Sequence, residues 1–392
     1  MKILFAVNLP TNELKKIGEN IQELKTNRMH FLFSLINYFW QHNYEIVIVS
    51  SDRTIDKDMV YEQKNLRIYI VKLWMHGKIS AADNFKNDIL KLKRVIRSEI
   101  CDVYNAHWSY EYAQACLEVN AEKTVITVHD WPNAVCPAIG NYYWKKRNIL
   151  GNKVIERGKL FTAVSPYIKE NIENENKMAE VFLTPDYLCE EELQVITKGG
   201  KKKDENFRII CVNNGFNGIK NTEKAMEAFH KFHKENPMSS MNMYGDGYES
   251  GGRAYAWAED RGLLEGITFN GRVDRKEIAS AFQKADVLLH TSREESFGLV
   301  YLEAMASETL IIAGKNAGAT SWVLDGGKAG VLVDVDDLED IYRALKSVNN
   351  DEKKREELIS DGLKRVKESF LFNSVVKSYK ECYKKICNFS NE

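Results

Sequence analysis

The chain is poor in proline and carries almost no net charge. It has 6 prolines in 392 residues and a formal net charge of -1, so its bulk charge does not favour nucleic acid as a partner. The seven cysteines are scattered, with Cys382 and Cys387 the closest pair, which is typical of reduced thiols in a cytoplasm and not of a metal cluster. No segment is apolar and long enough to span a bilayer, and the apolar start at residues 2–7 is too short for a signal peptide.

The composition instead favours two domains, since 44% of the residues are hydrophobic and 28% are charged. In the first half, strand-like runs rich in β-branched residues alternate with amphipathic runs. This alternation predicts a parallel sheet with helices on both faces, which binds ligands at the carboxyl ends of its strands. The predicted strands are 2–7, 45–50, 66–71, 101–106, 124–129 and 160–164, and the predicted helices are 29–41, 82–96, 110–117 and 165–173.

A polar, lysine-rich stretch at 197–206 has no hydrophobic period and is typical of an interdomain linker. The alternation then restarts, which predicts a second parallel α/β unit, and residues 351–386 are expected to form two or three helices. The strands expected here are 208–212, 241–244, 267–270, 285–290, 310–313 and 330–333, and the helices are 222–232, 253–261, 275–282, 299–306 and 338–348.

The segment 295–306, Glu-Ser-Phe-Gly-Leu-Val-Tyr-Leu-Glu-Ala-Met-Ala, follows one of these strands. Its apolar spacing becomes helical at Leu299, and the N-terminus of a helix has free backbone N–H groups that bind phosphate. Gly298 lets a ligand approach the backbone closely. With Glu295 in the loop and Glu303 in the helix, the segment suits a nucleotide sugar: a diphosphate on the amides and hydroxyls on the carboxylates.

This segment resembles the Glu-x7-Glu motif of the family 4 (group 1) retaining glycosyltransferases, which have the GT-B fold. The matching residues are Glu295, Phe297, Gly298, Glu303, Ala304, Met305 and Ala306. The resemblance implies an α/β fold with two Rossmann-like parallel-sheet domains that face a cleft. It also implies an acceptor domain at 1–190, a nucleotide-sugar donor domain at 205–370, and a helix at 371–392 that packs back on the first domain.

The resemblance also implies roles for the donor-site residues. Glu303 is expected to bind ribose and Glu295 the hexose. Lys220, in the turn 213–221, matches the lysine that neutralises the diphosphate in the family. Further donor contacts are expected at Ser296, Phe297, Gly298 and Leu299.

Two departures from the family pattern in the second half bear directly on the donor contacts. Gly215 stands where the family usually has an arginine that pairs with the diphosphate, and Arg272 is a candidate to supply the missing charge or to border the base. The glycine-bearing loop that faces the donor is matched at Gly318, but Ser321 and Trp322 stand where a glutamate is frequent.

His129 and Asp130 follow the strand 124–129, and a polar pair at such a strand end points toward the ligand site. The family has a similar histidine near the reacting centre, so His129 is expected to orient and polarise the sugar and acceptor. A histidine hydrogen-bonded in a structural turn is the alternative. For His107, which ends the preceding strand, the structural and functional interpretations are equally supported.

The sequence therefore predicts a retaining glycosyltransferase that moves a hexose from a nucleotide diphosphate sugar to a hydroxyl of a glycan or lipid-linked glycan. A UDP-sugar is the favoured donor and GDP-mannose the alternative. No metal or other cofactor is expected. The expected setting is bacterial surface polysaccharide synthesis in the cytoplasm, with a peripheral membrane contact at the basic helix 85–97 or at 145–147 as one interpretation and solvated protein surface as the other. The rival functions are a nucleotide-sugar epimerase and a non-catalytic binding protein on the same fold.

Overall fold

The computed structural model describes residues 1–19, 30–74, 76–190, 193 and 206–389. These residues form two compact units, Met1–Pro185 with Val375–Glu392, and Asp186–Ser374. Each unit is built on a parallel or mostly parallel sheet, which confirms the predicted α/β fold with two Rossmann-like domains. Residue 29, where a helix was predicted to begin, and most of the expected linker, residues 197–205, lie outside the described part of the chain.

The first unit contains an eight-stranded sheet in the order β3-β4-β2-β1-β5-β6-β7-β8. All neighbours pair in parallel except β3, which is antiparallel to β4. Two short edge strands, β3 and β8, were not expected from the sequence, because neither presents a continuous buried run. The strands are β1 (Lys2–Ala6), β2 (Glu45–Asp52), β3 (Met59–Gln63), β4 (Leu66–Lys72), β5 (Val103–His107), β6 (Thr124–Val128), β7 (Leu160–Ala163) and β8 (Glu180–Leu183).

The helices Thr11–Glu19, Gly77–Ala82 and Pro132–Ile139 were not predicted from the sequence, and two further predictions need correction. The helix predicted over 82–96 begins only at Lys86, because Asn84 and Phe85 adopt the left-handed conformation with φ of 57° and 61° and separate it from the helix that ends at Ala82. The segment 145–147, expected as an exposed loop, lies inside a 16-residue helix. The helices are α1 (Thr11–Glu19), α2 (His30–Gln41), α3 (Gly77–Ala82), α4 (Lys86–Arg97), α5 (Glu111–Asn120), α6 (Pro132–Ile139), α7 (Tyr142–Arg157) and α8 (Pro166–Glu175), with a 3₁₀ turn η1 (Ala121–Lys123) after α5.

The basic face of α4 has partners within its own unit. Lys93 pairs with Glu118 at 2.7 Å and Arg94 with Asp58 at 3.1 Å. No helix among the described residues combines the length and apolarity that crossing a membrane requires.

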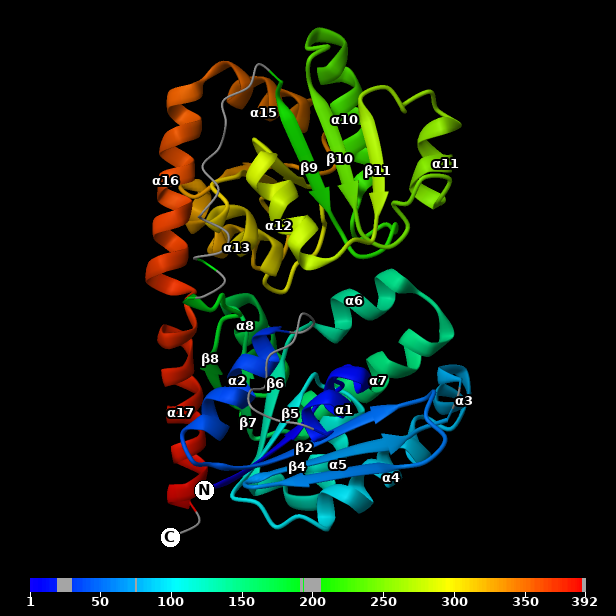
Figure 1. The fold of residues 1–392 in the computed structure, drawn as a ribbon, viewed down its shortest axis with the longest axis vertical. Helices are drawn as coiled ribbons and strands as arrows, with labels where there is room; N and C mark the ends of the chain where they lie inside the picture. The colour runs from blue at the N-terminus through cyan, green and yellow to red at the C-terminus, as the bar shows by residue number, and fades with distance from the viewer. Residues whose placement is uncertain (20–29, 75, 191–192, 194–205, 390–392) are drawn as a thin grey trace. The chain divides into compact units, whose positions relative to one another are not determined.

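The C-terminal helix, α17 (Phe372–Phe389), packs on the first unit from residue 375 onward (Figure 1). The Tyr383 hydroxyl donates to Oδ1 of Asn105 on β5 at 2.6 Å, and its ring lies 5.2 Å from that of Phe39 on α2. Lys385 forms an ion pair with Glu180 on β8. Both the sheet and a helix of the first unit therefore hold this last segment of the chain.

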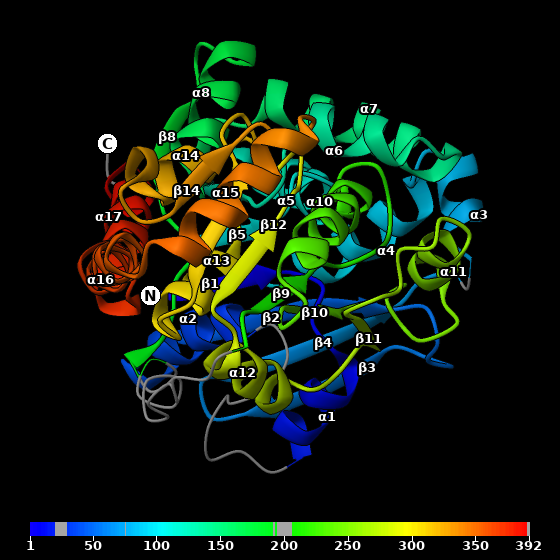
Figure 2. The ribbon, with the colours of Figure 1, turned by 90° about the horizontal axis from the view of Figure 1, so that it is seen from above.

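The second unit contains a six-stranded parallel sheet in the order β11-β10-β9-β12-β13-β14. Helices lie on both faces of this sheet (Figures 1 and 2). The strands are β9 (Arg208–Val212), β10 (Ser240–Tyr244), β11 (Ile267–Gly271), β12 (Val287–His290), β13 (Leu310–Gly314) and β14 (Val331–Val333). The helices are α10 (Thr222–Glu235), α11 (Arg253–Glu259), α12 (Arg275–Lys284), α13 (Leu299–Ala306), α14 (Thr320–Val323), α15 (Leu338–Asn350) and α16 (Glu352–Ser369), with a 3₁₀ turn η2 (Asp325–Gly327) after α14.

The hydrophobic core of the second unit follows the period of two of its strands. Ile209 and Cys211 on β9, like Val287 and Leu289 on β12, point to one face of the sheet and pack with side chains of α10, α11 and α15. The chain leaves β9 toward β10 on one side and reaches β12 on the other, so the strand order reverses between β9 and β12. Ligands of such sheets bind outside the carboxyl ends of the strands at this reversal.

Candidate active site

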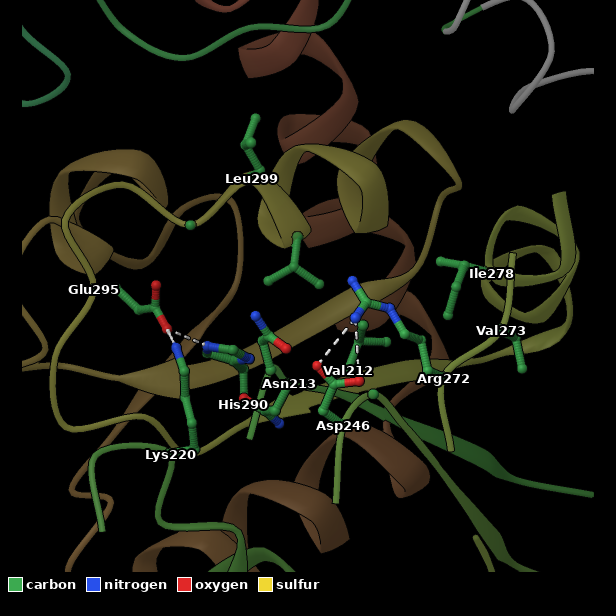
Figure 3. A pocket seen from close by; sticks show the side chains of 14 residues that line it. Val212, Asn213, Lys220, Asp246, Arg272, Val273, Ile278, His290, Glu295 and Leu299 are labelled. Atoms are coloured by element: carbon green, nitrogen blue, oxygen red, sulfur yellow. Dashed lines mark hydrogen bonds and ion pairs between the residues drawn. The ribbon is translucent and has the colours of Figure 1, made fainter. Parts of the chain in front are cut away.

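A cavity of about 340 Å³ lies at the carboxyl ends of β9 and β12 in the second unit. Figure 3 shows Lys220 and His290 converging on Glu295 at one side of it, and Arg272 with Asp246 at the other. The structure thus brings together five of the residues expected to bind the donor. The residues that line the cavity are Val212, Asn213, Asn214, Lys220, Gly245, Asp246, Arg272, Val273, Ile278, His290, Glu295, Gly298, Leu299 and Val300.

The polar centre of this cavity is the carboxylate of Glu295. Nζ of Lys220 lies 2.5 Å from Oε1 of Glu295, and Nε2 of His290 lies 2.8 Å from the same oxygen. Burial raises the pKa of the Glu295 carboxyl, but the charge of Lys220 and the hydrogen bond from His290 outweigh burial and hold that pKa well below its usual range. Glu295 is therefore an ionised carboxylate with two donors on one oxygen.

The loop that carries Glu295 is anchored from two directions. The buried Phe297 side chain packs edge-on against Trp322 and Phe370, at ring-centroid distances of 6.2 and 5.4 Å. The backbone N–H of Ala319 donates to the carbonyl of Glu295 at 2.8 Å, so the loop that contains Gly318 is tied to the loop of the carboxylate. The Phe297 side chain thus packs in the core, and Phe297 is not among the lining residues of the cavity, so its expected donor contact stays a prediction.

Gly298 caps α13 and borders the cavity. Its φ of 91° lies in the left-handed region, and a Cβ at this position would lie 2.5 Å from the Tyr301 ring. Only glycine fits this turn, which leads into the N-terminus of α13, a position at which helices can bind anions. Leu299, the first residue of α13, also lines the cavity.

Arg272 forms the second cationic group at the cavity, at its exposed rim. Its guanidinium pairs with Asp246 at 3.2 Å. Arg272 thus places a positive charge on the same cavity as Lys220 and Glu295, although Gly215 occupies the usual arginine position.

Glu303, Ser296 and Gly318 are not among the lining residues of this cavity. Glu303 is half-buried in α13, where burial raises the pKa of its carboxyl and the charge of Arg275 lowers it to a smaller extent. The expected roles of these three residues at the donor therefore stay predictions.

Two further polar residues line the cavity and were not assigned a role from the sequence. His290 ends β12, and Asn213 follows β9; their side chains are 2% and 5% exposed. Neither polar atom of the Asn213 amide has a hydrogen-bond partner among the described residues. The signal that could have found both is a polar residue at the end of a buried strand, the signal that singled out His129.

In the first unit, the ends of β5 and β6 bring His107 and His129 together. Nδ1 of His107 lies 2.9 Å from Nε2 of His129, so one of these two nitrogens carries the shared proton. Burial and the neighbouring charge of His129 lower the pKa of His107 well below its usual value. Trp108 stands over His129 at 4.7 Å between ring centroids, and its backbone has a φ of 66°, which is rare for so bulky a residue.

The next residue, Asp130, belongs to a second cluster in the same unit. The Tyr110 hydroxyl donates to Oδ1 of Asp130 at 3.0 Å, and the Arg147 guanidinium stacks over the Tyr110 ring at 3.8 Å. Arg147 also pairs with Glu111 at 3.1 Å. Burial raises the pKa of Asp130, although Arg147 and the Tyr110 hydroxyl act in the opposite direction.

The topology and the cavity define a class: an α/β protein of two Rossmann-like units with a cavity at the strand ends of the second unit, where ligands of such sheets bind. Two family models match the two halves of the chain. The model "Glycosyltransferase Family 4" matches residues 30–181, and "Glycosyl transferases group 1" matches residues 195–365. Together the two models cover most of the chain and show that it is a glycosyltransferase.

Individual relatives are similar over different shares of the chain. A D-inositol 3-phosphate glycosyltransferase of Paenarthrobacter aurescens is 40% identical over 100 residues, which are 26% of this chain and 24% of the relative. The match thus spans about a quarter of the length of that relative. An uncharacterized glycosyltransferase of Methanocaldococcus jannaschii is 23% identical over 343 residues, 83% of this chain and 88% of the relative. The solved structure of sucrose-phosphate synthase from Thermosynechococcus elongatus covers 100% of both chains with a TM-score of 0.77 at 15% identity, which shows a shared fold.

Proposed function

We propose that the protein is a retaining glycosyltransferase that moves a hexose from a nucleotide diphosphate sugar to a hydroxyl of a glycan or lipid-linked glycan. A UDP-sugar is the favoured donor and GDP-mannose the alternative. The observation that carries the proposal is the single cavity bordered by Lys220, Arg272, the N-terminus of α13 and Glu295. Cations and a helix N-terminus are phosphate-binding groups, and an ionised carboxylate accepts hydrogen bonds from sugar hydroxyls.

In this proposal the donor lies across the cavity. Lys220 and the first amides of α13 neutralise the diphosphate, and Arg272 supplies the second positive charge that Gly215 cannot. Glu295 accepts from hydroxyls of the hexose. Glu303 accepts from the ribose. The missing arginine and the altered glycine-bearing loop favour the alternative of a non-catalytic binding protein, and Arg272 on the cavity rim weakens the first of these two arguments.

The proposed transfer breaks the bond between the anomeric carbon and the diphosphate oxygen, and forms a bond from the acceptor oxygen to the same face of that carbon. The acceptor hydroxyl loses its proton to the leaving phosphate oxygen, which has become the more basic atom. Lys220 and the α13 amides stabilise the charge that develops on that phosphate. His129 is proposed to orient the reactants and polarise the acceptor hydroxyl.

The first test is thermal shift against UDP, GDP and their sugars, with the wild type and Glu303→Ala. A ligand that binds the native state raises its melting temperature. One diphosphate is expected to stabilise the wild type, with a smaller shift in Glu303→Ala if Glu303 binds the ribose. If no nucleotide shifts the wild-type curve at millimolar concentration, the donor site is wrongly placed.

Turnover separates the transferase from its rivals. Hydrolysis of the stabilising nucleotide sugar without acceptor is expected of a transferase and not of a binding protein, and an epimerase would change the sugar without releasing it. Because one relative is named a D-inositol 3-phosphate glycosyltransferase, D-inositol 3-phosphate is a further acceptor to be tried. NMR of the product shows which anomer forms and so tests retention. His129→Ala is expected to reduce the rate of transfer about 100-fold without weakening UDP binding. An inverted product contradicts the retaining mechanism.

A further inference from the structure

His290 contacts the carboxylate of Glu295 from the floor of the cavity. It is the last residue of β12 and is 2% exposed. Its Nε2 lies 2.8 Å from Oε1 of Glu295 and 2.9 Å from Oγ of Ser292 (Figure 3). The histidine thus reaches Glu295 from the sheet, whereas Lys220 reaches the same oxygen from the turn before α10.

The direction of the His290–Glu295 hydrogen bond follows from the charge of Glu295. An ionised carboxylate only accepts hydrogen bonds, so Nε2 of His290 carries the proton and donates it. Nδ1 of His290 is buried and has no hydrogen-bond partner among the described residues. No described group therefore competes to draw the Nε2 proton to the other nitrogen.

The ring of His290 is held in this orientation by packing. Tyr301 on α13 meets it edge-on, with centroids 5.2 Å apart and planes at 83°. The Tyr301 hydroxyl in turn lies 3.0 Å from Oγ1 of Thr320, the first residue of α14. Because Tyr301 and its partner Thr320 are both buried, the His290 ring has little freedom to turn away from Glu295.

We propose that His290 is a positioning residue that holds the Glu295 carboxylate for the sugar once a diphosphate takes Lys220. The inference rests on the proposed function, which assigns the diphosphate to Lys220 and the sugar hydroxyls to Glu295. Among the described residues, the Glu295 side chain has hydrogen bonds to Lys220 and His290. If the lysine turns to a phosphate, the histidine is the donor that remains to fix the direction of the carboxylate.

The experiment compares His290→Phe, which keeps a ring against Tyr301 but removes the donor, with His290→Gln, which keeps an N–H donor. UDP titration calorimetry measures diphosphate binding. Handling of the sugar is measured by the kcat and KM for hydrolysis of UDP-glucose, UDP-galactose, UDP-N-acetylglucosamine and GDP-mannose. Where GDP-mannose is the substrate, GDP replaces UDP in the calorimetric titration. His233→Phe is the matched control, since His233 is a buried histidine of the same unit that contacts Ser239 at 3.1 Å and stacks on Phe229, away from the cavity lining.

We expect His290→Phe to lower kcat about 10- to 100-fold while the Kd of the nucleoside diphosphate changes less than about threefold. His290→Gln is expected to recover most of that loss, and His233→Phe to leave kcat unchanged. In the Glu295→Gln background, His290→Phe should add little, because the group it positions has already been altered. Equal losses in the Phe and Gln variants, an undiminished kcat in His290→Phe, or additive losses in the double variant overturn the proposal.

Two further results keep this test decisive. If His290→Phe does not fold, His290→Leu against His290→Gln makes the same comparison of donor against no donor. If Glu295→Gln itself leaves hydrolysis intact, the proposed function has failed at Glu295. If Glu295→Gln lowers the rate of hydrolysis while His290→Phe does not impair it, the failure is confined to His290.

Discussion

The two units place polar clusters at the ends of similar parallel strands, but the clusters have opposite electrostatic character. In the second unit, Lys220 and His290 hold Glu295 ionised, with a pKa well below its usual range. In the first unit, burial moves each group toward its neutral form, because it lowers the pKa of His107 and raises that of Asp130. The strand ends therefore carry an ionised Glu295 in one unit, and in the other an aromatic-rich cluster in which burial favours the neutral forms of His107 and Asp130.

The difference teaches that the fold supplies the location of a site, whereas the neighbours of each side chain decide which ligand chemistry suits it. A site with a fixed cation and a helix N-terminus suits an anionic diphosphate. A site with Trp108 beside His129, whose ring nitrogen lies within hydrogen-bond distance of His107, suits a group that offers hydroxyls and apolar faces, as a sugar acceptor does. Variants in each cluster test this contrast.

The largest effect is expected from Lys220→Met. Removal of the cation both deletes a phosphate partner and leaves the Glu295 carboxylate to repel the diphosphate, so UDP binding is expected to weaken about 100-fold by calorimetry. Lys224→Met is the matched control: Lys224 lies on the same helix as Thr222 and pairs with Glu227 at 2.9 Å, away from the cavity lining. UDP affinity within threefold of wild type in Lys220→Met would contradict a charged diphosphate site.

Glu295→Gln is expected to act in the opposite direction on the same measurement. Glu295 holds Lys220 at 2.5 Å and adds a negative charge to the cavity, so its neutralisation should free the lysine and tighten UDP binding about 3- to 10-fold. The same variant should lower the rate of donor hydrolysis but leave a measurable residual rate, which separates diphosphate binding from sugar handling. Glu265→Gln, an exposed carboxyl outside the cavity lining, is the control. Weaker UDP binding in Glu295→Gln would show that the ion pair does not compete with the ligand.

Asn213→Leu is expected to have two effects of opposite sign. Both polar atoms of the buried Asn213 amide lack hydrogen-bond partners among the described residues. An apolar residue of similar size should therefore raise the free energy of unfolding by about 1 kcal/mol, and the melting temperature with it. UDP binding should fall about fivefold, if the amide meets the ligand. Asn176→Leu is the contrast, because Asn176 donates to three backbone carbonyls of the first unit and its loss should lower the melting temperature. A destabilised Asn213→Leu with normal UDP binding would make Asn213 a structural residue.

Much of the fold follows from local pattern. The strand Arg208–Val212 and the helix Leu299–Ala306 have the predicted bounds, because buried runs and apolar spacing define them. The break between α3 and α4 was missed because Asn84 and Phe85 in the left-handed conformation leave no mark in the apolar period. The position of Arg147 against Tyr110 was missed too, because a run of basic residues beside aromatic ones resembles an exposed loop.

The candidate site was predictable where a motif names the residues, as for Lys220 and Glu295, which the structure places 2.5 Å apart. The contact between Glu295 and His290 could not be predicted. His290 ends a strand and Glu295 lies in the loop after it, and the sequence does not fix the path of that loop. The contact between His107 and His129 depends likewise on the pairing of β5 with β6. Contacts between strand ends come from the register of the sheet, which a single sequence does not display.

The smallest effect, and the one specific to the first unit, is expected from Asp130→Asn. Because burial raises the folded-state pKa of Asp130, its contribution to stability is full below the unfolded pKa and is lost as pH rises through the folded pKa. Asparagine can still accept from the Tyr110 hydroxyl and does not titrate. The melting temperature of Asp130→Asn minus that of wild type should therefore be higher at pH 7.5 than at pH 4. The expected change is about one degree, which corresponds to roughly a few tenths of a kcal/mol of unfolding free energy. UDP affinity should not change, since the proposed function places the diphosphate in the charged cavity of the other unit. A relative melting temperature that falls as the pH rises would mean that Arg147 keeps Asp130 charged, and the contrast between the two clusters would then rest on the histidines alone.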